Sequence, residues 1–194
     1  MIKKTLTWRF LIFISLLSAI SLGNETSIRA ETTSQLESLQ QGVIKLTKAL
    51  SANDYFSRGY SKYSSGDKQG AIADFNEAIR INPNFADAYT GRGVIKYVLG
   101  DKQGAIADYN EAIRINPNST DAYNNRGIIK NDLGDKQGAI ADYNEAIRIN
   151  PNYADAYYNR GIIKNDLGDK QGAIADYNEA IRINPNRKYS PFSN

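Results

Sequence analysis

The stretch GDKQGAIADYNEAIRINPN, residues 100–118, decides the fold because the chain contains it four times, with Phe75 replacing the tyrosine in the first copy. The copies follow one another at a constant spacing of 34 residues. A period of this length is typical of stacked repeat units, each too small to bury its apolar face alone. The copies start at Gly66, Gly100, Gly134 and Gly168, which predicts four units at residues 52–85, 86–119, 120–153 and 154–187.

Each unit reads as two helices joined by a tight turn, as the second unit illustrates. Residues 87–99 form the first helix, and Gly100 suits the left-handed position that follows its end. Asp101 can then cap a second helix over residues 102–116. Apolar residues of this second helix, from Ala105 to Ile113, recur at i, i+1, i+4, i+7 and i+8, as on one face of an amphipathic helix. Pro117 ends it, because proline lacks a backbone donor.

In these features the unit resembles the tetratricopeptide repeat (TPR), a family of helix-turn-helix repeats of the same length. The resemblance covers residues 52–187. In each first helix it rests on an opening aromatic and a glycine four residues later: Tyr55, Tyr89, Tyr123 and Tyr157, then Gly59, Gly93, Gly127 and Gly161. In each second helix it rests on two alanines with an aromatic between them: Ala71, Ala105, Ala139 and Ala173, then Phe75, Tyr109, Tyr143 and Tyr177, then Ala78, Ala112, Ala146 and Ala180. A proline closes each unit: Pro83, Pro117, Pro151 and Pro185. The resemblance implies an all-α fold, a right-handed α-solenoid of four 34-residue helix-turn-helix units with an N-terminal capping helix.

Two positions of every first helix depart from the family pattern, with arginine in place of leucine and lysine in place of tyrosine. Because a half-buried arginine without a partner is costly, we expect each to pair with the aspartate of its own second helix. The lysine stems should lie over apolar surface with their ammonium groups in water. The alternative is a basic stripe that binds an acidic ligand. The arginines are Arg58, Arg92, Arg126 and Arg160, the lysines Lys62, Lys96, Lys130 and Lys164, and the aspartates Asp74, Asp108, Asp142 and Asp176.

The resemblance also implies that the first helices line a concave groove that binds an extended or helical peptide. Asparagine can both donate to and accept from a peptide backbone, and tyrosine offers a rigid ring with a polar tip. The alternative is a plain solvated face. The clamp of lysine, arginine and asparagine with which some members bind chaperone tails is not matched, which excludes that ligand class. The candidate groove residues are Phe56, Tyr60, Tyr63, Tyr97, Asn124, Asn125, Asn131, Tyr158, Asn159 and Asn165.

The two ends of the repeat array differ. Ser34-x-x-Glu37 is a capping-box pattern, and residues 34–50, within a segment 31–51, predict a helix that caps the first unit. The tail at 188–194 contains Pro191 and is too short for a cap. We therefore expect the last second helix to expose part of its apolar stripe and to self-associate or accept a partner. The residues concerned are Ile174, Tyr177 and Ile181.

Residues 1–30 have the pattern of a secretory signal peptide. Lys3, Lys4 and Arg9 precede an apolar run at residues 10–23, which is shorter than the roughly 20 residues needed to span a bilayer. Ala30 suits cleavage. The segment predicts export to a periplasm, a lumen or the extracellular space. The alternative is an uncleaved membrane anchor.

The composition of the chain argues against two classes of function, nucleic-acid binding and catalysis. The net charge of +3 comes from the leader, and residues 31–194 hold equal numbers of acidic and basic side chains, which argues against nucleic acid as a partner. Histidine and cysteine are both absent, so no catalytic, cofactor-binding or metal residue is predicted. We expect a scaffold that binds a peptide or protein partner in an extracytoplasmic compartment. The alternative is a membrane-anchored, self-associating structural tether, and an enzyme is disfavoured.

Overall fold

The computed structural model describes residues 31–40 and 50–186. The chain divides into two compact units, Met1–Ala49 and Leu50–Asn194. In the first unit residues 31–40 are helical, which confirms a helix over residues 34–40 of the predicted range, but Ser34 lies inside the helix and is not its N-cap. Residues 41–49 of the predicted range, the leader at 1–30 and the tail at 188–194 lie outside the described residues, and what is predicted of them stays a prediction. Leu50 is described and is not helical.

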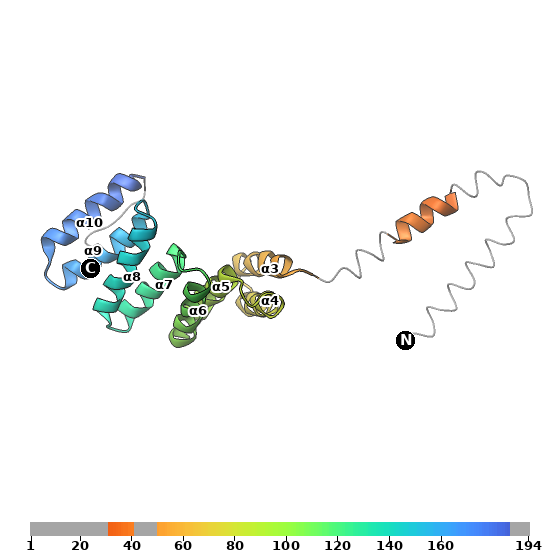
Figure 1. Ribbon diagram of the computed structural model, residues 1–194, viewed down its shortest axis with the longest axis horizontal. Helices are drawn as coiled ribbons and strands as arrows, with labels where there is room; N and C mark the ends of the chain where they lie inside the picture. Colours follow the sequence, from red (N-terminus) through yellow and green to blue (C-terminus); the bar gives the residue numbers. More distant parts are fainter. Residues whose placement is uncertain (1–30, 41–49, 187–194) are drawn as a thin grey trace, which may run out of the picture. The chain divides into compact units, whose positions relative to one another are not determined.

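The second unit is an array of four helix pairs, which follow one another in Figure 1. Between residues 50 and 186 it contains eight helices and no strand, which confirms an all-α solenoid of helix-turn-helix units. We call α3, α5, α7 and α9 the first helices and α4, α6, α8 and α10 the second helices. Their bounds are α3 Ala52–Ser64, α4 Lys68–Ile81, α5 Ala86–Val98, α6 Lys102–Ile115, α7 Thr120–Asp132, α8 Lys136–Ile149, α9 Ala154–Asp166 and α10 Lys170–Ile183.

The turns form where the sequence requires them. Gly134 has φ of 86°, which an L side chain rarely adopts, so the chain can turn sharply after α7. Asp135 then caps α8, because its carboxylate accepts the backbone N–H of Gly138 at 2.9 Å. At the other end of α8, the side-chain oxygen of Asn150 accepts the N–H of Asn152 at 3.0 Å around Pro151. The same devices recur at each turn of the array.

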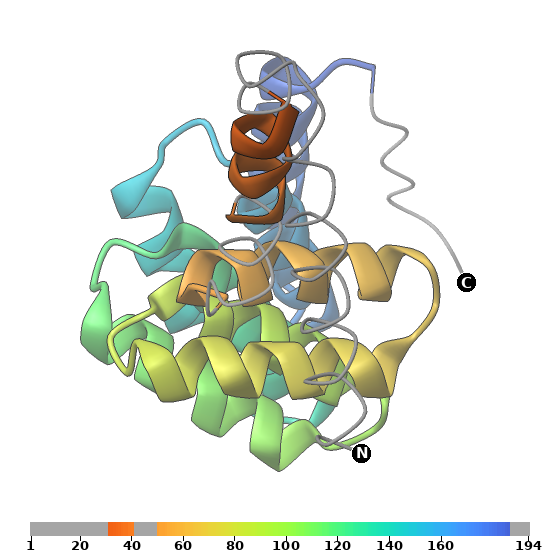
Figure 2. The same cartoon turned by 90° about the vertical axis from the view of Figure 1, so that its right-hand side faces the viewer.

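The packing of the helices makes the array curve. Each first helix contacts its own second helix, and Figure 2 shows α3 and α4 stacked against each other at one end. Successive first helices also contact one another, from α3 to α9, whereas the second helices of the described array do not. The first helices are therefore closer together and line the inner, concave side.

The apolar core is a series of clusters, each shared between two units. The middle cluster joins Ala105, Tyr109 and Ala112 of α6 to Ala122 and Ile129 of α7, and none of these is more than 1% exposed. Equivalent clusters join α4 to α5 and α8 to α9. Each second helix up to α8 is therefore covered by the next first helix, so a unit depends on its neighbour for burial.

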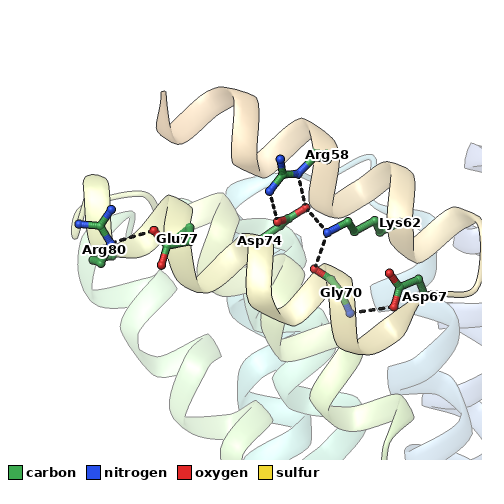
Figure 3. Close-up of polar contacts among 7 residues, drawn as sticks. All are labelled: Arg58, Lys62, Asp67, Gly70, Asp74, Glu77 and Arg80. Carbon is green, nitrogen blue, oxygen red and sulfur yellow. Dashed lines mark hydrogen bonds and ion pairs between the residues drawn. The ribbon is translucent and has the colours of Figure 1, made fainter. Parts of the chain in front are cut away.

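Every arginine of the first helices pairs with the aspartate of its own second helix, as predicted. Arg126 donates from Nε and Nη2 to the two carboxylate oxygens of Asp142, at 2.9 and 2.6 Å. The other three units have the same bidentate pair, and Figure 3 shows that of Arg58 with Asp74. Because each guanidinium group is engaged by a buried aspartate, the alternative of a basic stripe for an acidic ligand is wrong.

The prediction that the lysine heads lie in water is also wrong. Lys130 Nζ lies 2.9 Å from Asp142 Oδ2 and donates to the carbonyl of Gly138 at 3.5 Å. The lysines of the other three units form the same ion pair. The reason is that Asp142 is only 3% exposed. A carboxylate that has no access to water needs more hydrogen-bond donors for its oxygen lone pairs than one guanidinium supplies. The lysine ammonium group supplies the additional donor.

Three of the arginines also make a hydrogen bond across the junction between units. Arg126 Nη1 donates to Asn110 Oδ1 of α6 at 2.6 Å. Arg92 bonds Asn76 and Arg160 bonds Asn144 in the same way. Arg58 belongs to the first unit, and its side chain is 46% exposed, against 17% for Arg126. The arginine thus links its own unit to the preceding one.

Candidate functional site

The candidate site is the inner face, by which we mean the sides of α3, α5, α7 and α9 that line the concave side of the array. The aromatic candidates of this face contribute mainly to packing. The Phe56 ring lies between those of Tyr60 and Phe85, with centroids 4.9 and 4.8 Å away. Tyr63 packs against the first core cluster and Tyr97 against the second. Only Tyr60 is exposed, at 45%, with its edge on the Phe75 ring.

Two aromatic candidates connect neighbouring elements. Tyr97 Oη donates to Asp132 Oδ2 of the next unit at 2.7 Å. The Tyr158 ring is tilted against that of Tyr177 in α10, with centroids 5.7 Å apart. These rings are therefore held by the array itself, and less of their surface is available to a ligand.

The asparagine candidates divide into three groups. Asn124 is only 4% exposed and accepts a hydrogen bond from the side chain of Asn159 at 3.1 Å, so this pair connects α7 to α9. Asn125 and Asn131 are half-buried on α7, and Asn125 Oδ1 accepts a hydrogen bond from Asn124 Nδ2 at 3.4 Å. Asn165 is exposed at the C-terminal end of the array, where it lines a different cavity.

Two carboxylates complete the inner face, at positions that the family resemblance also assigns to the groove. Asp87 and Asp121 lie in the first turns of α5 and α7, where an acidic side chain favours the helix N-terminus. Both are exposed. The signal that finds them in the sequence is their shared place, two residues before the aromatic that opens each first helix.

Tyr60, Asp87 and Asp121 form an aromatic-acidic site that spans three units. Burial raises the pKa of the Tyr60 hydroxyl, and the charges of Asp87 and Asp121 raise it further. Each of the two carboxylates is therefore within electrostatic reach of Tyr60, although the three side chains come from three different first helices. Asp121 Oδ1 also accepts a hydrogen bond from Tyr153 Oη at 2.7 Å. In the described array no lysine or arginine lies within ion-pair distance of Asp87 or Asp121. Such a site can attract a cation to its carboxylates and to the face of the tyrosine ring.

Other carboxylates near the inner face are neutralised by the array. Asp132, at the end of α7, pairs with Lys102 at 3.4 Å, and Asp166, at the end of α9, pairs with Lys136 at 3.0 Å. No group of three acidic, histidine or cysteine side chains that could hold a metal ion occurs in residues 31–40 or 50–186. No helix within those same ranges is long and apolar enough to cross a bilayer.

The predicted association residues lie together at the C-terminal end. Ile174 and Ile181 are 51% and 45% exposed. With Tyr177 and Asn165 they line a cavity of about 640 Å³ on α10 and the end of α9. That they mediate association stays a prediction.

Comparisons with known proteins agree with this architecture. Family models of the tetratricopeptide repeat match residues 56–120, 108–141 and 154–187, and a model of the TPR repeat matches residues 129–168. A search of curated proteins found no match.

Three solved structures illustrate the likeness. A crystal structure of MamA is 21% identical, with a TM-score of 0.65 over 84% of this chain and 97% of that one. MamA from Desulfovibrio magneticus RS-1 is 20% identical, with a TM-score of 0.62 over 70% and 77% of the two chains. The first TPR of Spaghetti (RPAP3) bound to HSP90 peptide SRMEEVD is 24% identical, with a TM-score of 0.58 over 60% and 93%. At these identities the likeness shows the fold.

The family matches overlap into one continuous stretch, residues 56–187, which holds four helix pairs with the same turns, clusters and junctions. The chain therefore belongs to the tetratricopeptide-repeat family.

Proposed function

We propose that this protein is an extracytoplasmic scaffold, not an enzyme, whose inner face binds a peptide segment of a protein partner, and that this segment carries a lysine or arginine. The observation that carries the proposal is the site formed by Tyr60, Asp87 and Asp121, which offers two carboxylates without a cation beside an exposed ring. A basic side chain of the partner supplies the missing positive charge. The Nδ2 donors of half-buried Asn125, on the next turn of α7, can donate to a backbone carbonyl of the same segment, while its Oδ1 accepts from Asn124.

The charge of the inner face distinguishes this ligand from an acidic one. The RPAP3 domain is bound to the peptide SRMEEVD, which ends in three acidic residues within its last four. In this protein the arginines and lysines of the first helices are engaged with buried aspartates, as Arg126 and Lys130 are with Asp142. The groups that remain for a ligand are acidic or neutral, so a peptide of the opposite charge is favoured.

Fluorescence anisotropy on the full chain tests this proposal. Two labelled peptides are compared that differ only in having lysine or glutamate at every charged position. We expect the lysine peptide to bind, and its affinity to fall as salt is raised. Asp87→Asn and Asp121→Asn should each weaken binding about two- to fivefold, which is the range for an exposed ion pair.

Glu145→Gln is the matched control, because Glu145 is an exposed carboxylate of a second helix that pairs with Arg148 and lies off the inner face. It should leave the affinity unchanged. Preferential binding of the glutamate peptide, or equal loss in the control, would refute a cation site on the inner face.

The extracytoplasmic location is supported by the leader pattern at residues 1–30, with its basic start and its apolar run of 14 residues. N-terminal sequencing of the protein recovered from its host tests it. A mature chain that begins near Glu31 is the expected result. A membrane-bound chain that still begins at Met1 would instead favour the anchored, self-associating tether, for which the exposed Ile174 and Ile181 are the supporting observation.

A further inference from the structure

The outer side of α10 is the one second-helix surface in the described array that no first helix covers. Its sequence, KQGAIADYNEAIRI, is identical to that of α6 and α8. Those two helices are covered by α7 and α9. Within the array, α7 and α9 are therefore two examples of a helix that packs on a surface identical in sequence to that of α10.

The apolar part of the covering contact is formed by an alanine and an isoleucine. Ala122 and Ile129 of α7 join the cluster on α6 and are fully buried there, and Ile106 and Ile113 of α6 pack against this cluster. Ile174 and Ile181 are the equivalents of these in α10 and are about half exposed. The α10 surface thus has the second-helix residues of a core cluster but lacks the alanine and isoleucine that a following first helix would add.

The polar part of the contact is the hydrogen bond across the junction. Arg126 of α7 donates to Asn110 of α6, and Arg160 of α9 donates to Asn144 of α8. Asn178 is the equivalent residue of α10, and it is exposed. No arginine of the described array bonds to it. It lines the 640 Å³ cavity together with Ala173, Ile174, Tyr177 and Ile181.

A second copy of this chain is a poor occupant. The one first helix of the array that covers no second helix is α3. At the positions of Ala122 and Ile129 it carries Asp54 and Ser61. Stacking α3 on α10 in the manner of the internal junctions would bury a carboxylate and a hydroxyl against Ile174 and Ile181, which is unfavourable without new partners. The first unit is thus adapted to end the stack, whereas the last is not.

We propose that the α10 surface is a docking site for a helix of another protein with the pattern Ala-x-x-x-Arg-x-x-Ile. Its alanine and isoleucine complete the cluster over Ile174 and Ile181, and its arginine donates to Asn178. This site lies at the end of the array and does not depend on the inner face.

A peptide titration followed by NMR on the full, isotope-labelled chain tests the docking site. The probe is a synthetic copy of α7, residues 120–132, which has the required pattern. The control peptide has the same sequence except for Ala122→Asp and Ile129→Ser, the residues found in α3. Because an isolated helix of this length is marginal in water, the probe is titrated to millimolar concentration. We expect shifts confined to α10 and the end of α9, and at least tenfold weaker binding of the control peptide.

Variants of the protein locate the contact. Ile174→Asp should abolish binding, and Asn178→Ala should weaken it about two- to tenfold, as expected for one hydrogen bond. Val98→Asp alters an equally exposed apolar residue of α5 and should have no effect. Equal binding of both peptides, absence of shifts on α10, or full affinity of Ile174→Asp would overturn the proposal. So would concentration-dependent pairing of the protein through α10 without peptide, since this would show a second copy as the occupant.

Discussion

Removal of the Asp142 carboxylate in the variant Asp142→Ala should destabilise the array by about 3 kcal/mol. Loss of one partner from a buried ion pair costs roughly 3–5 kcal/mol, because the other charge is left without compensation. Here two cations lose their acceptor, Arg126 with 17% and Lys130 with 23% of the side chain exposed. The lower end of the range applies, because Arg126 keeps its bond to Asn110 and its contact with the ring of Tyr123.

The first unit is an internal control for this magnitude. Asp74 binds the same two cation types, but Arg58 is 46% exposed and can regain water when the carboxylate is removed. Asp74→Ala should therefore cost only about 1 kcal/mol, the upper value for an exposed pair. Replacing the whole triad by apolar residues, as Arg126→Leu, Lys130→Tyr and Asp142→Ala together, should recover most of the loss.

Guanidinium unfolding followed by helical circular dichroism measures these differences in the free energy of unfolding. The m-value must stay constant for the comparison to hold. An equal loss in Asp74→Ala and Asp142→Ala, or a loss below 1 kcal/mol in the latter, would refute the reasoning that burial of the cations sets the cost.

Three further predictions concern the turns, the helix contacts and pH. Gly127→Ala should cost about 1–3 kcal/mol in chemical unfolding, because its Cβ would lie 2.7 Å from Tyr143 Cε1; an unchanged midpoint would contradict this. Asp135→Ala should cost about 1 kcal/mol and speed amide exchange at Gly138, whose N–H it leaves without its acceptor; unaltered exchange there would be the contrary result. The Arg58 hydrogen bond holds the pKa of Asp74 below the ordinary aspartate value of 3.8, so this pair stabilises the fold above that value and the contribution is lost as pH falls through the native pKa. The difference in stability between the native chain and Asp74→Asn, from urea unfolding, should accordingly shrink between pH 7 and about pH 2, and a difference independent of pH would contradict the assignment.

The period and the turn residues allow most of the fold to be predicted, because they act locally. Gly134 needs only its own backbone conformation, and Asp135 needs only the N–H groups that follow it. The pairing of Arg126 with Asp142 is predictable too, since a half-buried guanidinium requires an acid and its own second helix offers one.

Contacts between units are harder to predict, because they depend on the angle at which one helix pair packs on the next. The spacing places Asn124 on a first helix but does not reveal that Asn159 of the next unit turns it inward. In the same way it places Asp87 and Asp121 at helix starts without revealing that Tyr60 lies near both. The first helices do line the concave side, but several of the predicted groove residues are held by contacts within the array, and peptide binding at this face stays a prediction.

The shared clusters at the junctions have a consequence for how such an array can change in length. Because α6 and α8 are identical and are covered by the same residue types, a deletion or duplication of 34 residues at equivalent points would rejoin a second helix to a first helix with the apolar cluster and the arginine–asparagine hydrogen bond of the junction intact. Unequal recombination within the gene can thus lengthen or shorten the stack in single steps. The first unit is excluded from this exchange, since in the interior its Asp54 and Ser61 would occupy the places of Ala122 and Ile129.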